Sequence, residues 1–216
     1  MAYRDRADAG RVLAAELGHL AGAPGLLVLG LQRGGVPVAY EVARALDAPF
    51  DVLLVRKLGV PGQPELAMGA IASGGVRVLN QAVIDSLAIP PEVVEAAADH
   101  EGAALARREQ AYRADRPGLD VAGRTVVVVD DGIATGSTMR AAVAALRAQQ
   151  AARIVVAVPV GARETCNELA READELVCPS TPAGFHAVGQ YYDDFSQTTD
   201  DEIRDLLIPK GDDHGE

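Results

Sequence analysis

The chain of 216 residues contains no tryptophan, and aromatic residues make up only 4% of it. It therefore has few side chains on which nucleic-acid bases could stack. Excess positive charge is also missing, because the net charge is −11. A duplex-binding surface needs clustered lysine and arginine. We therefore do not expect nucleic acid among the partners of this protein.

Cysteine and long apolar runs are scarce as well. The two cysteines, Cys166 and Cys178, lack the spacing of a metal-binding motif and suit a reducing compartment. We expect both to pack in the core. The segment 1–10 has no apolar stretch of the kind found in secretion signals, and no run approaches the ~20 apolar residues of a membrane span. These absences predict a cytoplasmic protein without a membrane partner.

Hydrophobic residues make up 49% of the chain, which is enough for a sizeable core. Short apolar runs alternate with segments whose apolar residues follow helical spacing. This alternation predicts an α/β fold with a doubly wound parallel sheet, and ligands bind such sheets at the carboxyl ends of the strands. The runs that we assign to this sheet are residues 26–29, 52–55, 126–129, 154–158 and 176–178.

We expect residues 1–210 to form one domain with two additions, followed by an acidic tail at 211–216. The segment of about 81–117 is longer than a simple crossover needs and predicts a helical insertion, with a long helix from about Pro91 to Tyr112. Its charged residues are interpreted first as a solvated helix face. The alternative is a lobe over the active site that contributes to substrate choice or to dimer contacts. A second addition, at about 179–208, contains many potential contact residues.

The most informative segment is Val126–Thr138, which reads VVVVDDGIATGST. Its consecutive valines predict a strand buried on both faces, and the residues after Thr138 have the apolar spacing of a helix. Between them lie the adjacent acids Asp130 and Asp131 and a loop of small residues. Such a loop lets backbone N–H groups close around a phosphate, and the helix N-terminus adds unsatisfied donors. With carboxylates placed to accept bonds from ribose hydroxyls, the segment predicts a site for a phosphorylated sugar.

Other phosphate-binding loops fit this segment less well. A Walker-type loop needs four residues between its glycines and a lysine after the second. Here three residues separate Gly132 from Gly136, and Ser137 follows. The dinucleotide fingerprint G-x-G-x-x-G is absent from every predicted strand-to-helix junction. The plain structural alternative is an ordinary turn, with Ser137 or Thr138 acting as a helix N-cap.

The same segment resembles the phosphoribosyl-pyrophosphate motif of type I phosphoribosyltransferases, in which an apolar strand, two acids and two variable residues precede A/D-T-G-x-T. The resemblance implies that phosphoribosyl pyrophosphate binds here together with Mg²⁺. It implies that Asp130 and Asp131 hold the ribose hydroxyls and the metal, with Asp131 also in a catalytic role. The residues implied to wrap the 5′-phosphate are Ala134, Thr135, Gly136, Ser137 and Thr138.

A second loop follows the first predicted strand and contains Gln32, Arg33, Gly34 and Gly35. Bare backbone N–H groups beside a guanidinium suit an oxygen-rich anion. By resemblance this is the pyrophosphate loop of the family, which implies a cis peptide between Gln32 and Arg33. The alternative is an ordinary turn with a surface arginine.

Arg56 and Lys57 end the second predicted strand and precede the segment Leu58–Glu65. Two glycines and two prolines within six residues of this segment predict a mobile loop rather than a helix or strand. By resemblance it is the lid that closes over pyrophosphate and excludes water. Arg56 and Lys57 are then pyrophosphate-binding residues, and Lys57 is also a catalytic candidate. Glu65 is a candidate acid or base, with a plain solvated carboxylate as the alternative.

The segment of about 179–208 corresponds by resemblance to the hood that selects the nucleophile, often by stacking on an aromatic ring. Ile133, Phe185 and Tyr191 are the acceptor-binding candidates, although each hood aromatic could equally be core packing. Hypoxanthine-guanine members of the family carry an aspartate at the position of Ala134, which argues against that substrate class.

These inferences predict a magnesium-dependent phosphoribosyltransferase, expected to be a homodimer. It would transfer ribose 5-phosphate to a small acceptor, such as a nitrogenous base, and release pyrophosphate. The alternative is a regulatory protein that senses phosphoribosyl pyrophosphate or a nucleotide without turning it over.

Overall fold

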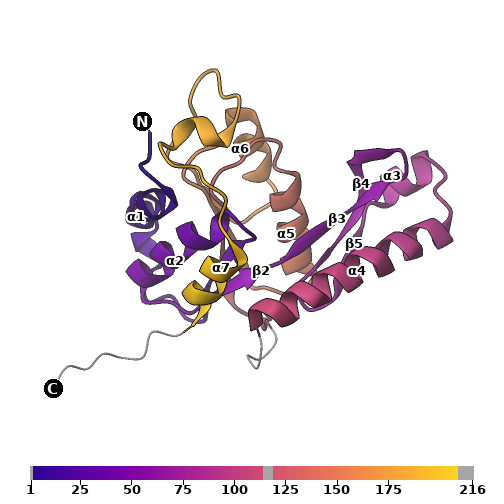
Figure 1. The fold of residues 1–216 in the computed structure, drawn as a ribbon, viewed down its shortest axis with the longest axis horizontal. Coiled ribbons are helices and arrows are strands. Elements are labelled where there is room, and N and C mark those ends of the chain that lie inside the picture. Colours follow the sequence, from indigo (N-terminus) through magenta and orange to yellow (C-terminus); the bar gives the residue numbers. More distant parts are fainter. Residues whose placement is uncertain (1, 114–118, 209–216) are drawn as a thin grey trace.

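The computed structural model describes residues 2–113 and 119–208, which form a body and a projecting arm (Figure 1). The predicted acidic tail, 211–216, lies outside the described residues. The body is built on a parallel sheet of order β2-β1-β6-β7-β8. Its strands are β1 (Leu26–Leu31), β2 (Phe50–Leu53), β6 (Thr125–Val129), β7 (Arg153–Ala157) and β8 (Glu175–Val177). The predicted α/β fold with a doubly wound parallel sheet is confirmed.

Helices cover both faces of this sheet because alternate strand residues point to opposite sides. On one face, α1 (Arg6–Glu16) and α2 (Gly35–Leu46) pack against a cluster that includes Val28 and Val127. On the other face, α5 (Ser137–Ala148) and α6 (Arg163–Leu169) cover a cluster that includes Val126 and Val128. Both cysteines are free thiols. Cys166 is buried, and Cys178 packs half-buried against the second cluster.

The strand order places the two predicted phosphate loops side by side. β1 and β6 are hydrogen-bonded neighbours, with Gly30 opposite Val129 at their carboxyl ends. The chain leaves β1 toward β2 on one side of the sheet and leaves β6 toward β7 on the other. This reversal is the topological switch point at which open α/β sheets bind ligands. The loops that follow β1 and β6 therefore open into the same crevice.

The arm is a three-stranded antiparallel sheet of β3 (Val55–Val60), β4 (Gln63–Ala72) and β5 (Val76–Leu79). The prediction that Leu58–Glu65 is a loop rather than a strand is therefore wrong, because this segment is the hairpin that joins β3 to β4. Its mobility and its role as a lid stay predictions. Val60 pairs with Gln63 across the two-residue turn Pro61-Gly62, in which Gly62 has φ +78°. Proline followed by a glycine with positive φ is the pattern of a tight type II turn. Gly59 lies at a shift in strand register, where the pairing bends.

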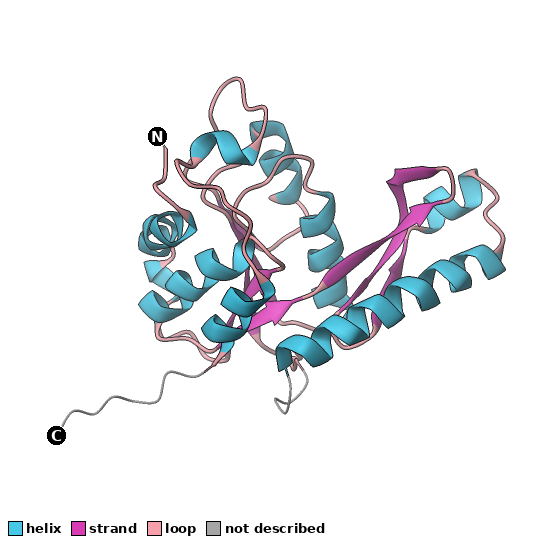
Figure 2. Cartoon of the chain, in the orientation of Figure 1, coloured by secondary structure: helices cyan, strands magenta, loops and turns pink. Residues whose placement is uncertain are grey.

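Two helices complete the arm, α3 (Gln81–Ser86) and α4 (Pro91–Arg113). Figure 2 shows α4 as one long helix running along the strands of the arm. α4 packs against β3 and β4, and α5 of the body contacts the strands of the same sheet. The described part of the predicted insertion is helical, and it packs on the strands of the arm, which in turn contact α5 of the body. Within the described residues, no helix has both the length and the apolar character needed to span a membrane.

The chain after β8 crosses back over the body as far as α1. It includes the 3-10 turn η2 (Val188–Tyr191) and ends in α7 (Asp200–Leu207), which starts with a capping box formed by Thr199 and Glu202. Tyr3 forms a β-bridge with Tyr192, and the backbone N–H of Tyr3 donates to the carbonyl of Tyr191 at 2.8 Å. A further short turn, η1 (Gly18–Leu20), follows α1. The N-terminal segment thereby secures the predicted hood beside the crevice.

Candidate functional site

The two loops at the switch point touch each other through glycine. A Cβ built on Gly34 would lie 1.9 Å from the Asp131 carboxylate, and one on Gly35 would lie 2.4 Å from the Val129 carbonyl oxygen. Any side chain larger than hydrogen would force the loops apart. The sequence R-G-G thus brings the predicted pyrophosphate loop against the predicted ribose-binding acids.

The acid pair lies in an environment that disfavours two negative charges. Burial, reinforced by the neighbouring charge of Asp131, raises the pKa of Asp130 well above the usual carboxyl value. Burial also raises the pKa of Asp131, whereas the Arg6 guanidinium acts in the opposite direction. The Asp130 carboxylate accepts a hydrogen bond from the backbone N–H of Asp131 at 2.9 Å. Hydrogen bonds from a polyhydroxyl ligand, or the charge of a cation, would stabilise the negative charge of these two carboxylates.

Arg6, at the start of α1, connects the acid pair to the hood. Its Nε lies 2.8 Å from Oδ2 of Asp131, and its Nη1 donates to the carbonyl of Ser196 at 2.6 Å. Its guanidinium also lies 4.1 Å from the ring centre of Phe195. The hydroxyl of Tyr192 donates to the backbone carbonyl of Asp131 at 2.6 Å. The N-terminal helix and the hood therefore both hold Asp131 in place.

The loop after β6 forms a small cavity of about 170 Å³ around its own backbone. Gly136 is the N-cap of α5 with φ +72°, and no side chain caps the helix. The alternative in which Ser137 or Thr138 acts as N-cap is therefore wrong. Their hydroxyls, at the first turn of α5, are not used for capping. Cavity, helix N-terminus and hydroxyls form the arrangement expected for a bound phosphate.

Side chains from two helices brace this loop from behind. The Thr165 hydroxyl on α6 donates to the carbonyl of Ala134 at 2.8 Å. Arg140 on α5 donates to the carbonyl of Thr135 at 3.0 Å and pairs with Glu168 of α6 and with Glu172, just after that helix. The loop carbonyls are thus engaged on the protein side, away from the cavity that would receive an anion.

The loop after β1 has the cis peptide between Gln32 and Arg33 that was predicted. The Gln32 amide donates to the Tyr112 hydroxyl at 3.1 Å, and that hydroxyl donates to Asp200 at 2.6 Å. Burial, followed by the hydrogen bond to Asp200, raises the pKa of Tyr112 to about 12. Arg33 lies 3.9 Å from the same aspartate. The loop is therefore tied to both α4 and α7.

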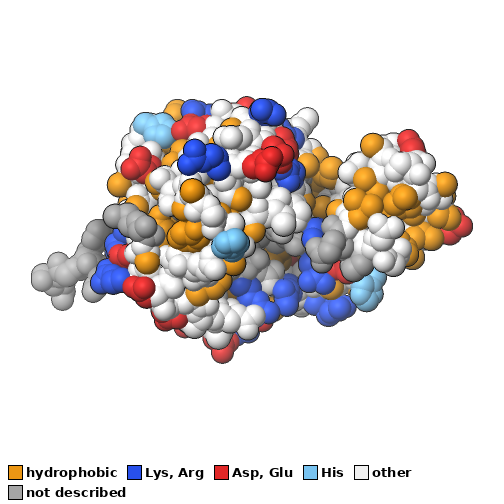
Figure 3. All heavy atoms as spheres, turned by 90° about the horizontal axis from the view of Figure 1, so that it is seen from above, with side chains coloured by type: hydrophobic (Ala, Val, Ile, Leu, Met, Phe, Trp, Pro, Cys, Tyr) orange, Lys and Arg blue, Asp and Glu red, His pale blue; other side chains and the backbone are white. Residues whose placement is uncertain are grey.

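A cavity of about 450 Å³ joins these groups, and most of the predicted pyrophosphate loop and one predicted acid lie on its wall. It also exposes residues that sequence analysis did not assign to the site, notably Arg6 and Arg108. Figure 3 shows lysine and arginine side chains gathered where the body meets the arm. The predicted site residues on its wall are Gln32, Arg33, Gly34, Arg56, Asp131 and Thr138.

Arg56 and Lys57 lie on β3, at the edge of the arm sheet, rather than at the end of a sheet strand of the body. Both line a larger groove of about 990 Å³ that reaches Thr138 and one face of α4. Arg56 pairs with Glu101 of α4 at 2.7 Å. The side chain of Glu65 lies outside the described residues, so its predicted acid or base role stays a prediction.

The acceptor candidates fall into two groups. Ile133 is 2% exposed, bridges to Gly161 and belongs to the core cluster, while also bordering the small cavity of the loop after β6. Phe185 and Tyr191 stack on each other, with ring centres 5.5 Å apart and planes 7° apart. Val188, between them in sequence, lies over Gly132 and borders the same cavity. The structure therefore brings Ile133 and Val188 together at the loop.

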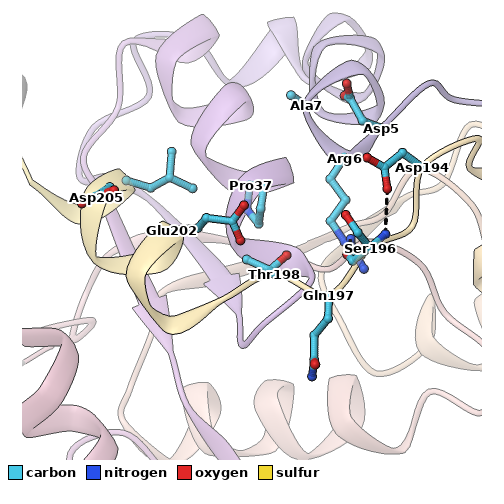
Figure 4. Close-up of a pocket in the computed structure, with 11 residues that line it drawn as sticks. Asp5, Arg6, Ala7, Pro37, Asp194, Ser196, Gln197, Thr198, Glu202 and Asp205 are labelled. Carbon is cyan, nitrogen blue, oxygen red and sulfur yellow. Dashed lines mark hydrogen bonds between the residues drawn. The ribbon is translucent and has the colours of Figure 1, made fainter.

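A separate cavity of about 370 Å³ lies behind Arg6, between α1, α2 and α7 (Figure 4). Its wall is acidic, but Asp5, Asp194 and Glu202, three of its four acidic residues, have structural roles. Asp5 caps α1, Asp194 accepts from the backbone N–H of Ser196 at 2.9 Å, and Glu202 completes the capping box of α7. These hydrogen bonds account for three of the four carboxylates of this cavity without a ligand.

No sequence motif assigned a role at this site to Arg6, Thr165 or Tyr192, each of which contacts the loops from a distant position. Arg6 and Asp131 are 125 residues apart in the chain. No local motif marks such partners, since their role depends on the fold that brings them near. The signal that existed was a clustering of aromatics and hydroxyls in the hood, which identifies a region but not a residue.

Comparison with known proteins agrees with this geometry. The family described as phosphoribosyl transferase domain matches residues 4–195. Rv0571c of Mycobacterium tuberculosis, named as a presumed phosphoribosyl transferase, is 51% identical over 201 residues, which are 93% of this chain and 45% of that protein. The chain thus spans about half the length of the curated relatives it matches. The crystal structure of TT1426 from Thermus thermophilus is 44% identical with a TM-score of 0.88, covering 96% of this chain and 98% of that one. The chain belongs to the phosphoribosyl transferase domain family.

Proposed function

We propose that this protein transfers ribose 5-phosphate from phosphoribosyl pyrophosphate to a small acceptor, with release of pyrophosphate. In this reaction the bond between C1 of the ribose and the pyrophosphate oxygen breaks. A bond from C1 to an acceptor nitrogen forms, and the acceptor loses a proton. The observation that carries the proposal is the meeting of three parts at one switch point: the loop with Arg33, the acid pair and the uncapped N-terminus of α5.

The three parts match the three charged or polar regions of the donor. The residues 134–138 would hold the 5′-phosphate through backbone N–H groups and the hydroxyls at the start of α5. Asp130 and Asp131 would accept hydrogen bonds from the ribose hydroxyls. The loop 32–35, with Arg56 and Lys57, would hold the pyrophosphate. Catalysis would then depend on orienting C1 and on neutralising the charge that develops on the leaving pyrophosphate.

The residues present also fit Mg²⁺. Within the described residues there is no group of three or more His, Cys, Asp or Glu side chains that could enclose a metal. Mg²⁺, however, is commonly bound through one or two carboxylates plus substrate phosphates. Asp130 and Asp131 supply two carboxylates whose pKa values are raised by burial, so a nearby cation would favour their charged forms. When bound, the metal would neutralise negative charge on the donor.

The acceptor subsite is proposed to lie between the loop after β6 and the hood. Val188 and Ile133 border the small cavity there, and Ala134 offers a methyl group in place of an acid. An apolar wall of this kind suits the flat face of a nitrogenous base better than a charged acceptor. The stacked pair of Phe185 and Tyr191 would then support Val188 from the hood rather than contact the base.

The experiment is a measurement of pyrophosphate release from phosphoribosyl pyrophosphate and Mg²⁺, screened over a panel of purine and pyrimidine bases. The Asp130→Asn, Asp131→Asn double variant is the control for release that does not depend on the site. We expect release with one class of base by the wild-type protein and none by the double variant. Tight donor binding without release over the whole panel would contradict the transferase and favour a sensor of phosphoribosyl pyrophosphate.

A further inference from the structure

One face of α4 is turned toward the crevice. Positions 101, 105, 108 and 112 lie three or four residues apart and therefore share one side of the helix. Glu101 pairs with Arg56 at 2.7 Å, Leu105 is 2% exposed, and the Tyr112 hydroxyl is hydrogen-bonded to Gln32 and Asp200. The remaining member, Arg108, lies between two anchored neighbours. The charged residues of α4 were expected to form a solvated face, but the helix presents one of them, Arg108, to the site.

Arg108 lines the same cavity as Arg33, Gly34 and Asp131. Its charge also acts on Asp200 of α7, which accepts the hydrogen bond from the Tyr112 hydroxyl. The Tyr112 hydroxyl, and then the charges of Arg33 and Arg108, lower the pKa of Asp200, against the effect of burial. Two arginines, one from the body and one from the arm, thus flank this region of the cavity.

The charge of Arg108 is less compensated than that of the other arginines around the cavity. Arg6 pairs with Asp131 at 2.8 Å and Arg56 with Glu101 at 2.7 Å. Arg33 lies 3.9 Å from Asp200. In the part of the chain that the structure describes, Arg108 makes no ion pair with a carboxylate. In a chain of net charge −11, a half-buried arginine without such a partner at an anion site is a candidate ligand group.

We propose that Arg108 is a pyrophosphate-binding residue, supplied by the arm, that faces Arg33 across the cavity. This inference rests on the proposed function. The guanidinium would donate to phosphate oxygens of the donor and would neutralise charge on the leaving pyrophosphate. The arm would thereby contribute a fixed cation to the site from a packed helix.

The test is calorimetric binding of magnesium pyrophosphate to the wild-type protein and to three variants. Arg108→Gln removes the charge and keeps much of the aliphatic part of the side chain. Arg108→Lys keeps the charge without the two-pronged geometry of the guanidinium group. Arg107→Ala is the matched control, because Arg107 is the adjacent, exposed arginine of the same helix. A lost charge-assisted hydrogen bond should weaken pyrophosphate binding by about tenfold or more in Arg108→Gln. We expect an intermediate loss in Arg108→Lys and none in Arg107→Ala.

Ribose 5-phosphate provides the second readout, since it probes the phosphate loop without the pyrophosphate subsite. Its affinity should be unchanged in Arg108→Gln, whereas a general disturbance of the fold would weaken both ligands together. Equal pyrophosphate affinity in Arg108→Gln and wild type would overturn this inference and leave the transferase proposal standing. If the wild-type protein bound neither magnesium pyrophosphate nor ribose 5-phosphate, the transferase proposal itself would be overturned.

Discussion

The ion pair between Arg6 and Asp131 should be strongly coupled energetically. Both side chains are largely buried, at 12% and 13% exposure, and Nε lies 2.8 Å from Oδ2. Arg6→Met leaves Asp131 buried without its cation and also removes the contact with Phe195. Breaking one partner of a buried pair costs about 3–5 kcal/mol. Because some solvent reaches this pair, we expect a loss near the lower limit, about 3 kcal/mol.

The double-mutant cycle separates the pair from its surroundings. Asp131→Asn removes the charge but relieves repulsion with Asp130, so we expect it to cost about 1 kcal/mol or less. In the double variant the orphaned charge no longer exists, and the total loss should be about 2 kcal/mol rather than the sum of the single losses. The coupling of about 2 kcal/mol is measured by urea unfolding at pH 7.

The matched control is Arg11→Met on the same helix. Arg11 is 49% exposed on its side chain and lies 3.5 Å from Asp8 and 3.8 Å from Glu41. Exposed pairs contribute about 0–1 kcal/mol, so this variant should unfold close to wild type. Additive effects of Arg6→Met and Asp131→Asn would refute the argument that the hood and the acid pair are connected through Arg6.

Asp130, Gly136 and Lys57 each offer a separate test of the site. The pKa of Asp130 is higher in the folded than in the unfolded protein, so the wild-type protein loses stability as the pH rises from the unfolded pKa through the folded pKa. Asp130→Asn should therefore melt at a higher temperature than wild type at pH 7, and this difference in melting temperature should disappear near pH ~4. Gly136→Ala combines a left-handed φ of +72° with a Cβ only 2.6 Å from Thr165, so it should cost at least about 1–2 kcal/mol in urea unfolding and weaken ribose 5-phosphate binding in calorimetry. Lys57→Ala should weaken pyrophosphate binding in the same calorimetric assay by about tenfold, and an unchanged affinity would remove Lys57 from the site.

The fold could be predicted because its determinants are local. Runs such as 126–129 are short, apolar and β-branched, and they alternate with amphipathic segments, which is sufficient to indicate a parallel sheet with helices on both faces. The position of the two predicted phosphate loops side by side followed from the same pattern, since ligands bind where parallel strands end. Gly34 and Gly35 were identified for their bare backbone, and the structure adds that the neighbouring acids leave no space for a side chain.

The prediction of a loop at 58–65 was wrong because proline and glycine have opposite effects on structure at different positions. In a run of such residues they prevent regular structure, but at the two central positions of a turn they favour it. Pro61-Gly62 occupies those positions, and the flanking residues Val60 and Gln63 pair across it. In the same sheet, β4 pairs with β5 across a turn whose glycines, Gly74 and Gly75, are flanked by apolar runs.

The remaining site residues depend on tertiary contacts that no short pattern encodes. The sequence of α4 is charged on several faces, so it does not indicate which face meets the body. Only the anchoring of Glu101 and Tyr112 orients Arg108 toward the cavity. Arg6 likewise belongs to an ordinary amphipathic helix until the fold brings it to Asp131.

The most direct test of the central claim is calorimetric titration of phosphoribosyl pyrophosphate with Mg²⁺ into the wild-type protein and the Asp130→Asn, Asp131→Asn double variant. We predict saturable one-site binding to the wild type and at least about a hundredfold weaker binding to the double variant, whose fold should be intact because like charges are relieved. Circular dichroism and urea unfolding establish that the variant is folded. Unchanged affinity in a folded double variant would contradict the assignment of the acid pair to the donor site.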